Sequence, residues 1–366
     1  MEASQMVDWR NIHEKRDHSL STMPLAGLSS LYGLGVKIRA SIYARMRKKE
    51  LPGFVVSIGN LTAGGTGKTP AAAMIAEWAL KEGYRPAILS RGYGSKHKGK
   101  ILDVSDGQHL FATPTEAGDE PYLLAKKLEG VPVIISKARY DAGILAHQRY
   151  GTDFFILDDG FQHICLKRNL DLVLLDATSP FGNMRLLPGG PLREPVDPPP
   201  RADAFILTRT GPGTTLIMMN FLKKKFGGKP VFQSEHIPEK IVFPDLRKVY
   251  SAQFVKGKRV VAFAGIAKPE VFKDTLAKLG AEPVLFQAYK DHHAFSPKEV
   301  KQLVAAKNKL RADHLITTEK DWVRLEGVSP HTPDLAYLTI RFQIAGSESF
   351  FKMICERRGD LRCNSR

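Results

Sequence analysis

The sequence predicts an α/β protein with a largely parallel sheet covered by helices on both faces, followed by a second, smaller α/β lobe. Apolar, β-branched runs such as FVVSI at 54–58 and FFIL at 154–157 recur with helix-length stretches between them. Continuous apolar runs are typical of strands buried on both faces of a parallel sheet. A second series of such runs begins near residue 258, and 366 residues are enough for two cores.

The strands expected in the first series are 54–58, 85–94, 131–136, 152–160, 170–178 and 202–210. Those expected in the second series are 258–267, 282–289, 312–321 and 336–342. Alternation of strand and helix indicates βαβ units. The domain boundaries expected from this pattern are an N-terminal segment 1–50, a first α/β domain 51–235, a connector 236–257, a smaller lobe 258–350 and a basic tail 351–366.

A glycine-rich turn follows the first strand and ends in Lys68-Thr69, before a predicted helix over 71–80. Glycines let backbone N–H groups converge on phosphate oxygens, lysine adds a charge, and a Thr hydroxyl can bind Mg²⁺. The strict pattern G-x-x-x-x-G-K-[ST] has glycine where this chain has Thr62. We predict a P-loop NTPase-like nucleotide site here; the alternative is a turn that is glycine-rich only for tight packing.

The composition points to an anionic partner. The formal net charge is +16 and the sequence pI is about 9.6. Nucleic acid, an anionic membrane surface or a phosphorylated substrate would each fit such a charge. Three cysteines without metal-type spacing suggest a reducing, cytoplasmic setting, and the polar N-terminus does not resemble a secretory signal.

No charged residue occurs over 19–36, and a basic cluster from Lys37 to Lys49 follows directly. The segment is diluted by Ser, Gly and Pro, so it falls short of the roughly 20 predominantly apolar residues of a spanning helix. An amphipathic segment lying in the headgroup region of a membrane is one reading. A helix packed on the protein's own core is the other, and the sequence does not decide between them.

Acidic residues follow a later strand. Asp158 and Asp159 end the run over 152–160, where a phosphate-loop fold needs a carboxylate to hold Mg²⁺. A solvated Asp-Asp-Gly turn is the alternative. Gln162 and His163 follow closely enough to face the same crevice. The proline-rich stretch 184–201 excludes regular structure and is expected to be a functional loop.

Two further groups could take part in chemistry. Asp119 opens a predicted helix, where an acid is often only a favourable cap, but it could also serve as a base. His292 and His293 lie in a loop after a strand, and most such histidines are structural. The stretch from Thr318 to Asp321 reads TEKD, which does not fit the guanine-reading N-K-x-D pattern, so a GTPase is not favoured.

Seven motifs occur in an order that resembles one family, the tetraacyldisaccharide 4′-kinases. They are GNLTAGGTGKTP, SRGYG, GDEP, DDGFQH, LLPGGPLREP, DHH and TEKD, and the similarity covers roughly residues 20–345. The resemblance implies transfer of the ATP γ-phosphoryl group to the 4′-hydroxyl of an acylated glucosamine disaccharide 1-phosphate, a lipid A precursor. It also implies a peripheral protein at the cytoplasmic face of the bacterial inner membrane, with the active site between a P-loop domain and a smaller lobe.

The resemblance also implies roles for individual residues. Asp119 would be the catalytic base, assisted by His292 or, less in keeping with the motif, His293. Lys68 would act in catalysis as well as in binding. The residues expected to bind ATP are Thr62, Ala63, Gly64, Gly65, Thr66, Gly67, Lys68, Thr69, Arg139 and Arg193. Those expected at Mg²⁺ are Thr69, Asp158, Asp159, Gln162 and Glu194, with His163 lining the same site.

The main alternative function is a P-loop ATPase that binds nucleic acid through its basic surface. Against it, the basic clusters lack the interleaved aromatic residues that a stacking single-strand binder needs. A nucleotide-binding regulator without catalysis is a third possibility. We expect a lipid substrate, an anionic membrane surface, no nucleic-acid partner and a monomeric chain.

Overall fold

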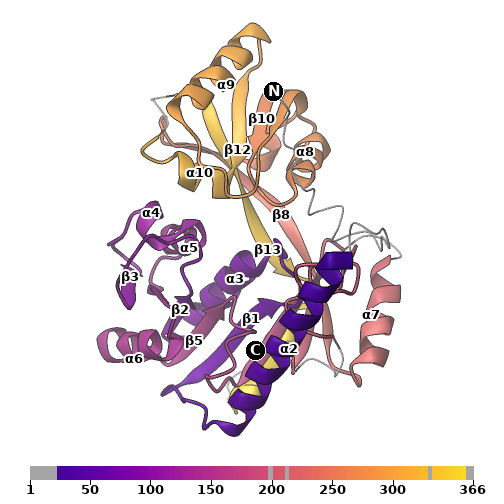
Figure 1. Cartoon of the computed structure of the whole chain (residues 1–366). Coiled ribbons are helices and arrows are strands. Elements are labelled where there is room, and N and C mark those ends of the chain that lie inside the picture. The colour runs from indigo at the N-terminus through magenta and orange to yellow at the C-terminus, as the bar shows by residue number, and fades with distance from the viewer. Residues whose placement is uncertain (1–22, 197–200, 211–213, 329–331, 360–366) are drawn as a thin grey trace. The chain divides into compact units, whose positions relative to one another are not determined.

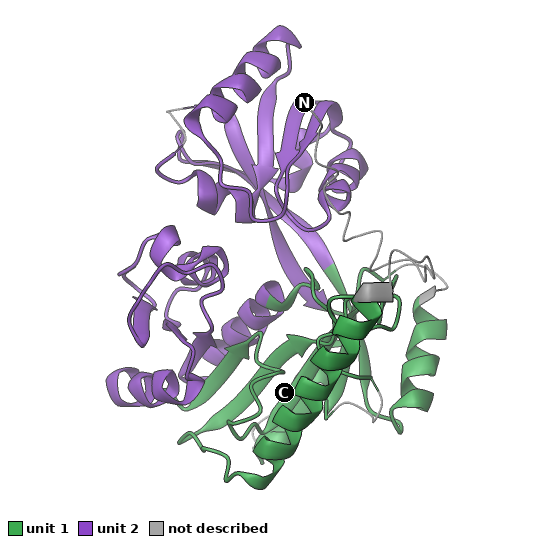
Figure 2. Cartoon of the chain, in the orientation of Figure 1, with its two compact units in different colours: residues 1–68, 152–235, 344–366 green, residues 69–151, 236–343 purple. Residues whose placement is uncertain are grey.

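The computed structural model describes residues 23–196, 201–210, 214–328 and 332–359. The first 22 residues, part of the proline-rich loop and the last seven residues of the predicted basic tail lie outside these ranges. The chain forms two compact units, shown in different colours in Figure 2. Unit 1 comprises residues 1–68, 152–235 and 344–366, and unit 2 comprises 69–151 and 236–343.

Unit 1 is built on a parallel sheet with β1 (Phe54–Asn60) at its centre. On one side β1 pairs with β5 (Phe154–Asp158). On the other side follow β6 (Leu170–Asp176), β7 (Ala204–Thr208) and the first residues of β8 (Val231–Phe243). Every residue of β1, β5, β6 and β7 is buried. The prediction of a parallel sheet built from continuous apolar runs is confirmed.

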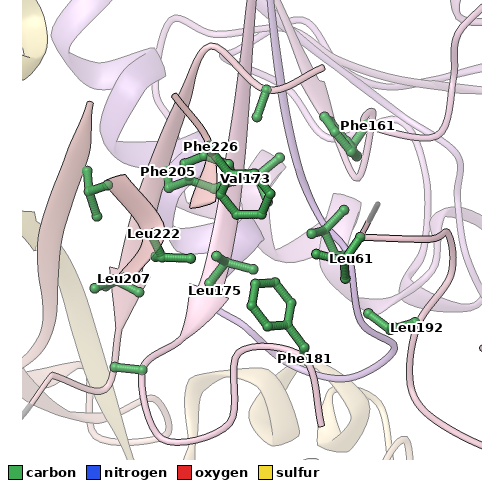
Figure 3. Close-up of a cluster of buried hydrophobic side chains, with 14 residues drawn as sticks. Leu61, Phe161, Val173, Leu175, Phe181, Leu192, Phe205, Leu207, Leu222 and Phe226 are labelled. Atoms are coloured by element: carbon green, nitrogen blue, oxygen red, sulfur yellow. The ribbon is translucent and has the colours of Figure 1, made fainter. Parts of the chain in front are cut away.

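One face of β6 and β7 carries the hydrophobic core shown in Figure 3. Helix α7 (Thr214–Lys225) covers it, and the Phe226 ring stacks on Phe205 with 4.7 Å between centroids. Helix α11 (Ser347–Arg358) packs on β8, where Phe350 meets Phe232 at 5.1 Å. Leu61, Phe161, Phe181 and Leu192 close the core from the loops.

Helix α2 (Met23–Arg45) belongs to unit 1 and docks on the proline-rich loop. The Ser29 hydroxyl donates to the Leu186 carbonyl at 2.9 Å and accepts from the Gly189 N–H at 3.0 Å. The other side of the helix exposes an apolar stripe, formed by Leu31, Leu34, Ile38 and Ile42. The helix therefore packs on the protein through Ser29, while attachment of the exposed stripe to a membrane stays a prediction. Among the described residues, no helix combines the length and hydrophobicity needed to cross a membrane.

Residues 69–151 of unit 2 contribute three strands to the sheet. β2 (Pro86–Ser90) and β4 (Val133–Ser136) are parallel, while β3 (Ile101–Ser105) is antiparallel to β4. β3 was not predicted because its first three residues, which include Asp103, are only partly buried and no continuous apolar run marks it. The helices of this part are α3 (Lys68–Lys81), α4 (Pro114–Ala117), α5 (Asp119–Lys127) and α6 (Arg139–Tyr150).

The rest of unit 2 has a parallel sheet in the order β11 (Glu282–Ala288), β10 (Arg259–Ala264), β12 (His314–Thr318), β13 (Leu335–Ile344). Helix α8 (Pro269–Lys278) covers one face of it. Helices α9 (Pro297–Lys309) and α10 (Glu319–Leu325) cover the other.

The stretch 236–257, expected as a connector, contains regular structure. β8 continues to Phe243 and pairs antiparallel with β9 (Lys248–Ser251), and a 3₁₀ turn, η2 (Ala252–Val255), follows.

Within unit 2, α5 and α10 are joined by ion pairs. Lys320 Nζ lies 3.0 Å from Glu120, and Lys126 pairs with Glu326. Lys127 also donates to the Ile340 carbonyl on β13 at 2.8 Å. These contacts hold the first turn of α5, which begins with Asp119, against the start of α10.

Candidate active site

The predicted phosphate loop lies directly after β1 in unit 1. Asn60, the last residue of β1, donates from Nδ2 to the Gly64 carbonyl at 3.3 Å and to Thr66 Oγ1 at 3.2 Å. Gly64 and Gly67 have φ values of 120° and 85°, which L-residues with a side chain rarely adopt. α3 begins at Lys68, so a helix N-terminus follows the turn. This is the local geometry in which backbone N–H groups bind phosphate.

Asp159 contacts two positively charged side chains, Arg193 and Lys68, beside this loop. Arg193 Nη1 donates to both of its carboxylate oxygens, at 2.8 and 2.9 Å, and Lys68 Nζ lies 3.6 Å from Oδ1. Asp159 has φ 51°, so it turns away from the course of β5 immediately after Asp158. Asp158 is 2% exposed. One carboxylate between two cations leaves a positive balance that suits a phosphate group.

The proline-rich loop pairs with the start of the phosphate loop. The Ala63 N–H donates to the Pro191 carbonyl at 2.7 Å, and the Arg193 N–H donates to the Leu61 carbonyl at 2.7 Å. The described part of this loop, up to residue 196, contains no helix or strand, as the prolines predicted. These two backbone hydrogen bonds therefore hold the proline-rich loop in the position where Arg193 reaches Asp159.

Gln162 and Glu194 also meet in unit 1. Gln162 Nε2 donates to the Asn60 carbonyl at 3.0 Å and to Glu194 Oε1 at 2.7 Å. Arg201 donates to Glu194 at 2.8 Å and lies over the Phe161 ring, 4.0 Å from its centroid. The predicted neighbourhood of Gln162 and Glu194 therefore exists in the structure. His163 instead contacts Cys165, with 3.2 Å between Nε2 and Sγ.

Arg209 is a residue that sequence reasoning missed. It follows β7 with φ 55°, forms an ion pair with Asp176 at the end of β6, and donates from Nη2 to the Gly65 carbonyl at 2.7 Å. The carboxyl ends of parallel strands are where ligands bind in open α/β sheets. An arginine directly after a buried strand was the available signal.

Unit 2 holds a second cluster, centred on Asp119. His292 Nδ1 lies 3.0 Å from Asp119 Oδ2, and Arg324 Nε donates to the same oxygen at 2.6 Å. Both hydrogen bonds end on Oδ2 of Asp119, not on Oδ1. Tyr93, from the predicted SRGYG motif, packs against the His292 ring with centroids 5.8 Å apart.

The electrostatics of this cluster keep Asp119 ionised. Burial raises the pKa of Asp119, but the hydrogen bond from His292 and the charge of Arg324 outweigh it and lower the pKa to about 2. An ionised carboxylate can only accept hydrogen bonds, so the contact with Asp119 assigns the proton to Nδ1 of His292, which also lies 3.3 Å from Arg324 Nη2. The cluster is therefore an Asp–His pair in which the proton lies on the histidine.

Arg324 is itself firmly held, with 5% of its side chain exposed. It donates to the Gly265 carbonyl at 2.7 Å and to Asp321 Oδ1 at 2.9 Å. Asp321 also accepts from the Gly265 N–H at 3.1 Å and from Thr318 Oγ1 at 2.7 Å. The TEKD motif thus caps α10 and orients the arginine. The sequence singled out the motif but not Arg324.

The two adjacent histidines have different partners. His292 has φ 59°, its N–H donates to the Gly265 carbonyl at 3.1 Å, and its ring faces Asp119. His293 Nε2 instead lies 2.9 Å from Glu299 Oε1 on α9. The structure therefore brings His292, rather than His293, to Asp119.

The remaining predicted residues lie elsewhere in unit 2. Arg139 is 3% exposed and donates from Nη1 to the Ser136 carbonyl at 3.1 Å, where α6 begins. Thr69 is the second residue of α3. Unit 1 thus contains Thr62 to Lys68, both aspartates of the Asp-Asp pair, Gln162, Arg193 and Glu194; unit 2 contains Thr69, Asp119, Arg139 and His292.

Comparison with known proteins decides the family. A family model described as tetraacyldisaccharide-1-P 4′-kinase matches residues 21–358. The chain belongs to this family. Tetraacyldisaccharide 4′-kinase of Syntrophus aciditrophicus is 38% identical, covering 96% of this chain and 97% of the relative. The enzyme of the same name from Geobacter metallireducens is 42% identical, covering 82% of this chain and 88% of the relative.

A solved member of the family has a similar structure. The crystal structure of Aquifex aeolicus LpxK in complex with ATP matches with a TM-score of 0.74 and 33% sequence identity. The match covers 92% of this chain and 99% of that one. The resemblance seen in seven sequence motifs is confirmed, and so is the α/β fold class. The relatives are named as kinases of an acylated sugar, so the nucleic-acid ATPase is set aside.

The residues near the phosphate loop suit Mg²⁺. Hydroxyl, carboxylate and amide oxygens are the hard ligands that this ion prefers. Over the ranges that the structure describes, no three His, Cys, Asp or Glu side chains gather as a protein-only metal site would require. Mg²⁺ usually takes one or two protein carboxylates and completes its shell with water and phosphate.

Proposed function

We propose that this chain performs its family's reaction with the phosphate loop of unit 1 holding ATP and Asp119 of unit 2 acting on the acceptor hydroxyl. The reaction is transfer of the γ-phosphoryl group to the 4′-hydroxyl of a tetraacyldisaccharide 1-phosphate. The observation that carries the proposal is the Asp119–His292–Arg324 cluster. An ionised, anchored acid with a histidine hydrogen-bonded to it can position an acceptor hydroxyl in a kinase.

ATP binding falls to Thr62, Ala63, Gly64, Gly65, Thr66, Gly67, Lys68 and Thr69, with Arg139 and Arg193 as further phosphate ligands. Support comes from the positive-φ glycines, from the helix that begins at Lys68 and from the ATP complex of the Aquifex relative. In the structure Lys68 and Arg193 both face Asp159. Phosphate oxygens would compete with the Asp159 carboxylate for Lys68 and Arg193. Once bound to phosphate, the two cations would stabilise the negative charge that develops during transfer.

Mg²⁺ would be held by oxygen atoms of Thr69, Asp158, Asp159, Gln162 and Glu194. When bound, the ion would neutralise phosphate charge. Asp158 is buried at the end of β5, and Gln162 is tied to Glu194, so these groups are fixed before any ion arrives. Arg201 on Glu194 offsets part of the acidic charge.

Asp119 would take the proton of the acceptor hydroxyl. A carboxylate with a pKa of about 2 is a weak base. Phosphoryl transfer proceeds through a loose transition state, so the hydroxyl need not lose its proton early, and positioning is the larger effect. His292 Nδ1 and Arg324 Nε both bind Oδ2 of Asp119, so Oδ1 is the oxygen that would meet the acceptor hydroxyl. His292 and Arg324 therefore orient the acid.

The location we propose is the cytoplasmic face of the bacterial inner membrane, as a peripheral protein. An acceptor with four acyl chains resides in a lipid bilayer. Helix α2 exposes an apolar stripe and ends in a basic cluster, which suits the surface of an anionic bilayer. Tyr32 and Arg39 on the same helix donate to the carbonyls of Arg193 and Gln162, at 3.0 and 2.9 Å. The helix is thus bonded to the loops that carry the phosphate and metal ligands.

The test is transfer of radiolabelled γ-phosphate from ATP·Mg²⁺ to a tetraacyldisaccharide 1-phosphate in detergent micelles. Labelled lipid should form with the wild type and disappear with Lys68→Ala. Lys81→Ala, at the other end of the same helix, should keep the activity. ATP binding without any labelled lipid in the wild type would refute the proposal. Omitting Mg²⁺ should abolish transfer.

A further inference from the structure

Helix α7 exposes large apolar side chains that the proposed catalytic machinery does not use. Leu216 is 65% exposed, Ile217 is 72% exposed and Phe221 is 46% exposed. All three lie within the first eight residues of the helix. The opposite side of the helix carries Leu222, which is fully buried in the core of unit 1. The helix is thus anchored on one side and apolar on the other.

The outer face continues into lysines. Leu216 and Lys223 are seven positions apart, as are Ile217 and Lys224, so each pair lies on one line along the helix. Lys223 and Lys224 are exposed in the last turn. Two parallel rows therefore run from an apolar residue to a cation. Such rows suit the surface of an anionic bilayer. The apolar residues would enter the apolar layer, and the long lysine side chains would reach the charged headgroups above it.

Helix α7 shares its support with α2. Phe181 lies just before the proline-rich stretch, and its ring packs on Phe221 and on Phe226, each with 6.4 Å between centroids. Leu186, further along that segment, packs against the core of unit 1 and accepts a hydrogen bond from Ser29 of α2. Both helices belong to unit 1 (Figures 1 and 2). Both carry exposed apolar side chains.

We propose that the outer face of α7 is a second attachment site for an anionic bilayer, beside that offered by α2. The inference rests on the proposed function, whose acceptor carries four acyl chains. Leu216, Ile217 and Phe221 enter the boundary between headgroups and acyl chains, and Lys223 with Lys224 meets the lipid phosphates. Two attachment points on one compact unit fix its orientation at the surface, which a single helix does not.

The experiment is sedimentation with vesicles of phosphatidylethanolamine and phosphatidylglycerol, compared with phosphatidylcholine vesicles. The double variant Leu216→Ser/Ile217→Ser should bind the anionic vesicles at least about tenfold more weakly than wild type. Lys223→Gln/Lys224→Gln should lose about fivefold per lysine on anionic vesicles and nothing on neutral ones. Val249→Ser is the matched control, since Val249 is 58% exposed on β9. It should bind as wild type does.

Kinase activity on substrate in detergent micelles is measured on the same preparations. Retained micellar activity with weakened vesicle binding supports the inference. Unchanged vesicle binding by the α7 variants overturns it, and so does a change of oligomeric state in light scattering without a change in vesicle binding, which would mark the face as a contact between copies. No transfer by the wild type in micelles would instead refute the proposed function.

A measurement on the unmodified chain covers the case in which a variant does not fold. Hydrogen exchange of the wild type should slow over 216–225 when anionic vesicles are added. Exchange over 248–255, which includes Val249, should not change. Equal exchange over 216–225 with and without vesicles would overturn the inference.

Discussion

Replacing Arg324 with glutamine should change the pH dependence of catalysis. In the wild type the pKa of Asp119 is about 2 instead of 3.8, a difference equivalent to about 2 kcal/mol. Arg324 is the full positive charge nearest that carboxylate, with Nε 2.6 Å from Oδ2. Without it, burial is opposed only by His292, so the pKa of Asp119 rises. The acid limb of kcat/KM should then appear at higher pH than in the wild type.

The size of the effect follows from the contact that is lost. A hydrogen bond to a charged group contributes about 1.5–3 kcal/mol, which corresponds to a roughly 10- to 100-fold loss of kcat/KM if it acts in the transition state. The assay is micellar kinase activity across the acid range. Lys320→Gln is the control, because it breaks the ion pair with Glu120 in the same α5–α10 interface and leaves Asp119 untouched. A folded Arg324→Gln enzyme with wild-type kcat/KM and acid limb would refute the reasoning.

Three further predictions concern stability and the histidine pair. Asp119→Asn should lower the free energy of unfolding by about 2 kcal/mol at neutral pH. Since the folded pKa is depressed, that difference should fade as pH drops from about 3.8 through about 2; a difference constant with pH in urea denaturation would contradict it. His292→Asn should reduce kcat while His293→Asn leaves it near wild type, and equal losses would contradict the assignment. Gly59→Ala should cost about 1–3 kcal/mol, because its Cβ would lie 2.4 Å from Phe161 Cβ; an unchanged melting temperature would contradict this.

Elements defined by local pattern could be predicted from the sequence. β1 and the glycine-rich turn after it depend on a short apolar run and on backbone freedom at Gly64 and Gly67, both of which are visible in the sequence. The lack of helix and strand in the described part of the proline-rich loop could also be predicted, because prolines are visible in the sequence and exclude regular structure. β3 was missed because polar residues interrupt its apolar run, and β9 because all four of its residues are exposed.

Contacts between distant segments could not be predicted in this way. Arg324 reaches Asp119 across 205 positions, and Ser29 reaches Gly189 across 160. Nothing in the local sequence of either partner specifies the other. The assignment of His292 rather than His293 to Asp119 likewise depends on the positive φ of His292 and its bond to Gly265, which only the folded loop reveals.

The most direct test of the account is made on Asp119→Ala, with ATP binding and single-turnover phosphoryl transfer measured on one preparation. Asp119 lies apart in the sequence from the phosphate loop that we assign to ATP, so binding should stay within a few-fold of wild type. Transfer to the tetraacyldisaccharide 1-phosphate should fall by about 10²- to 10⁴-fold, as expected for loss of a general base. Transfer at the wild-type rate would show that Asp119 is not the base and would contradict the account.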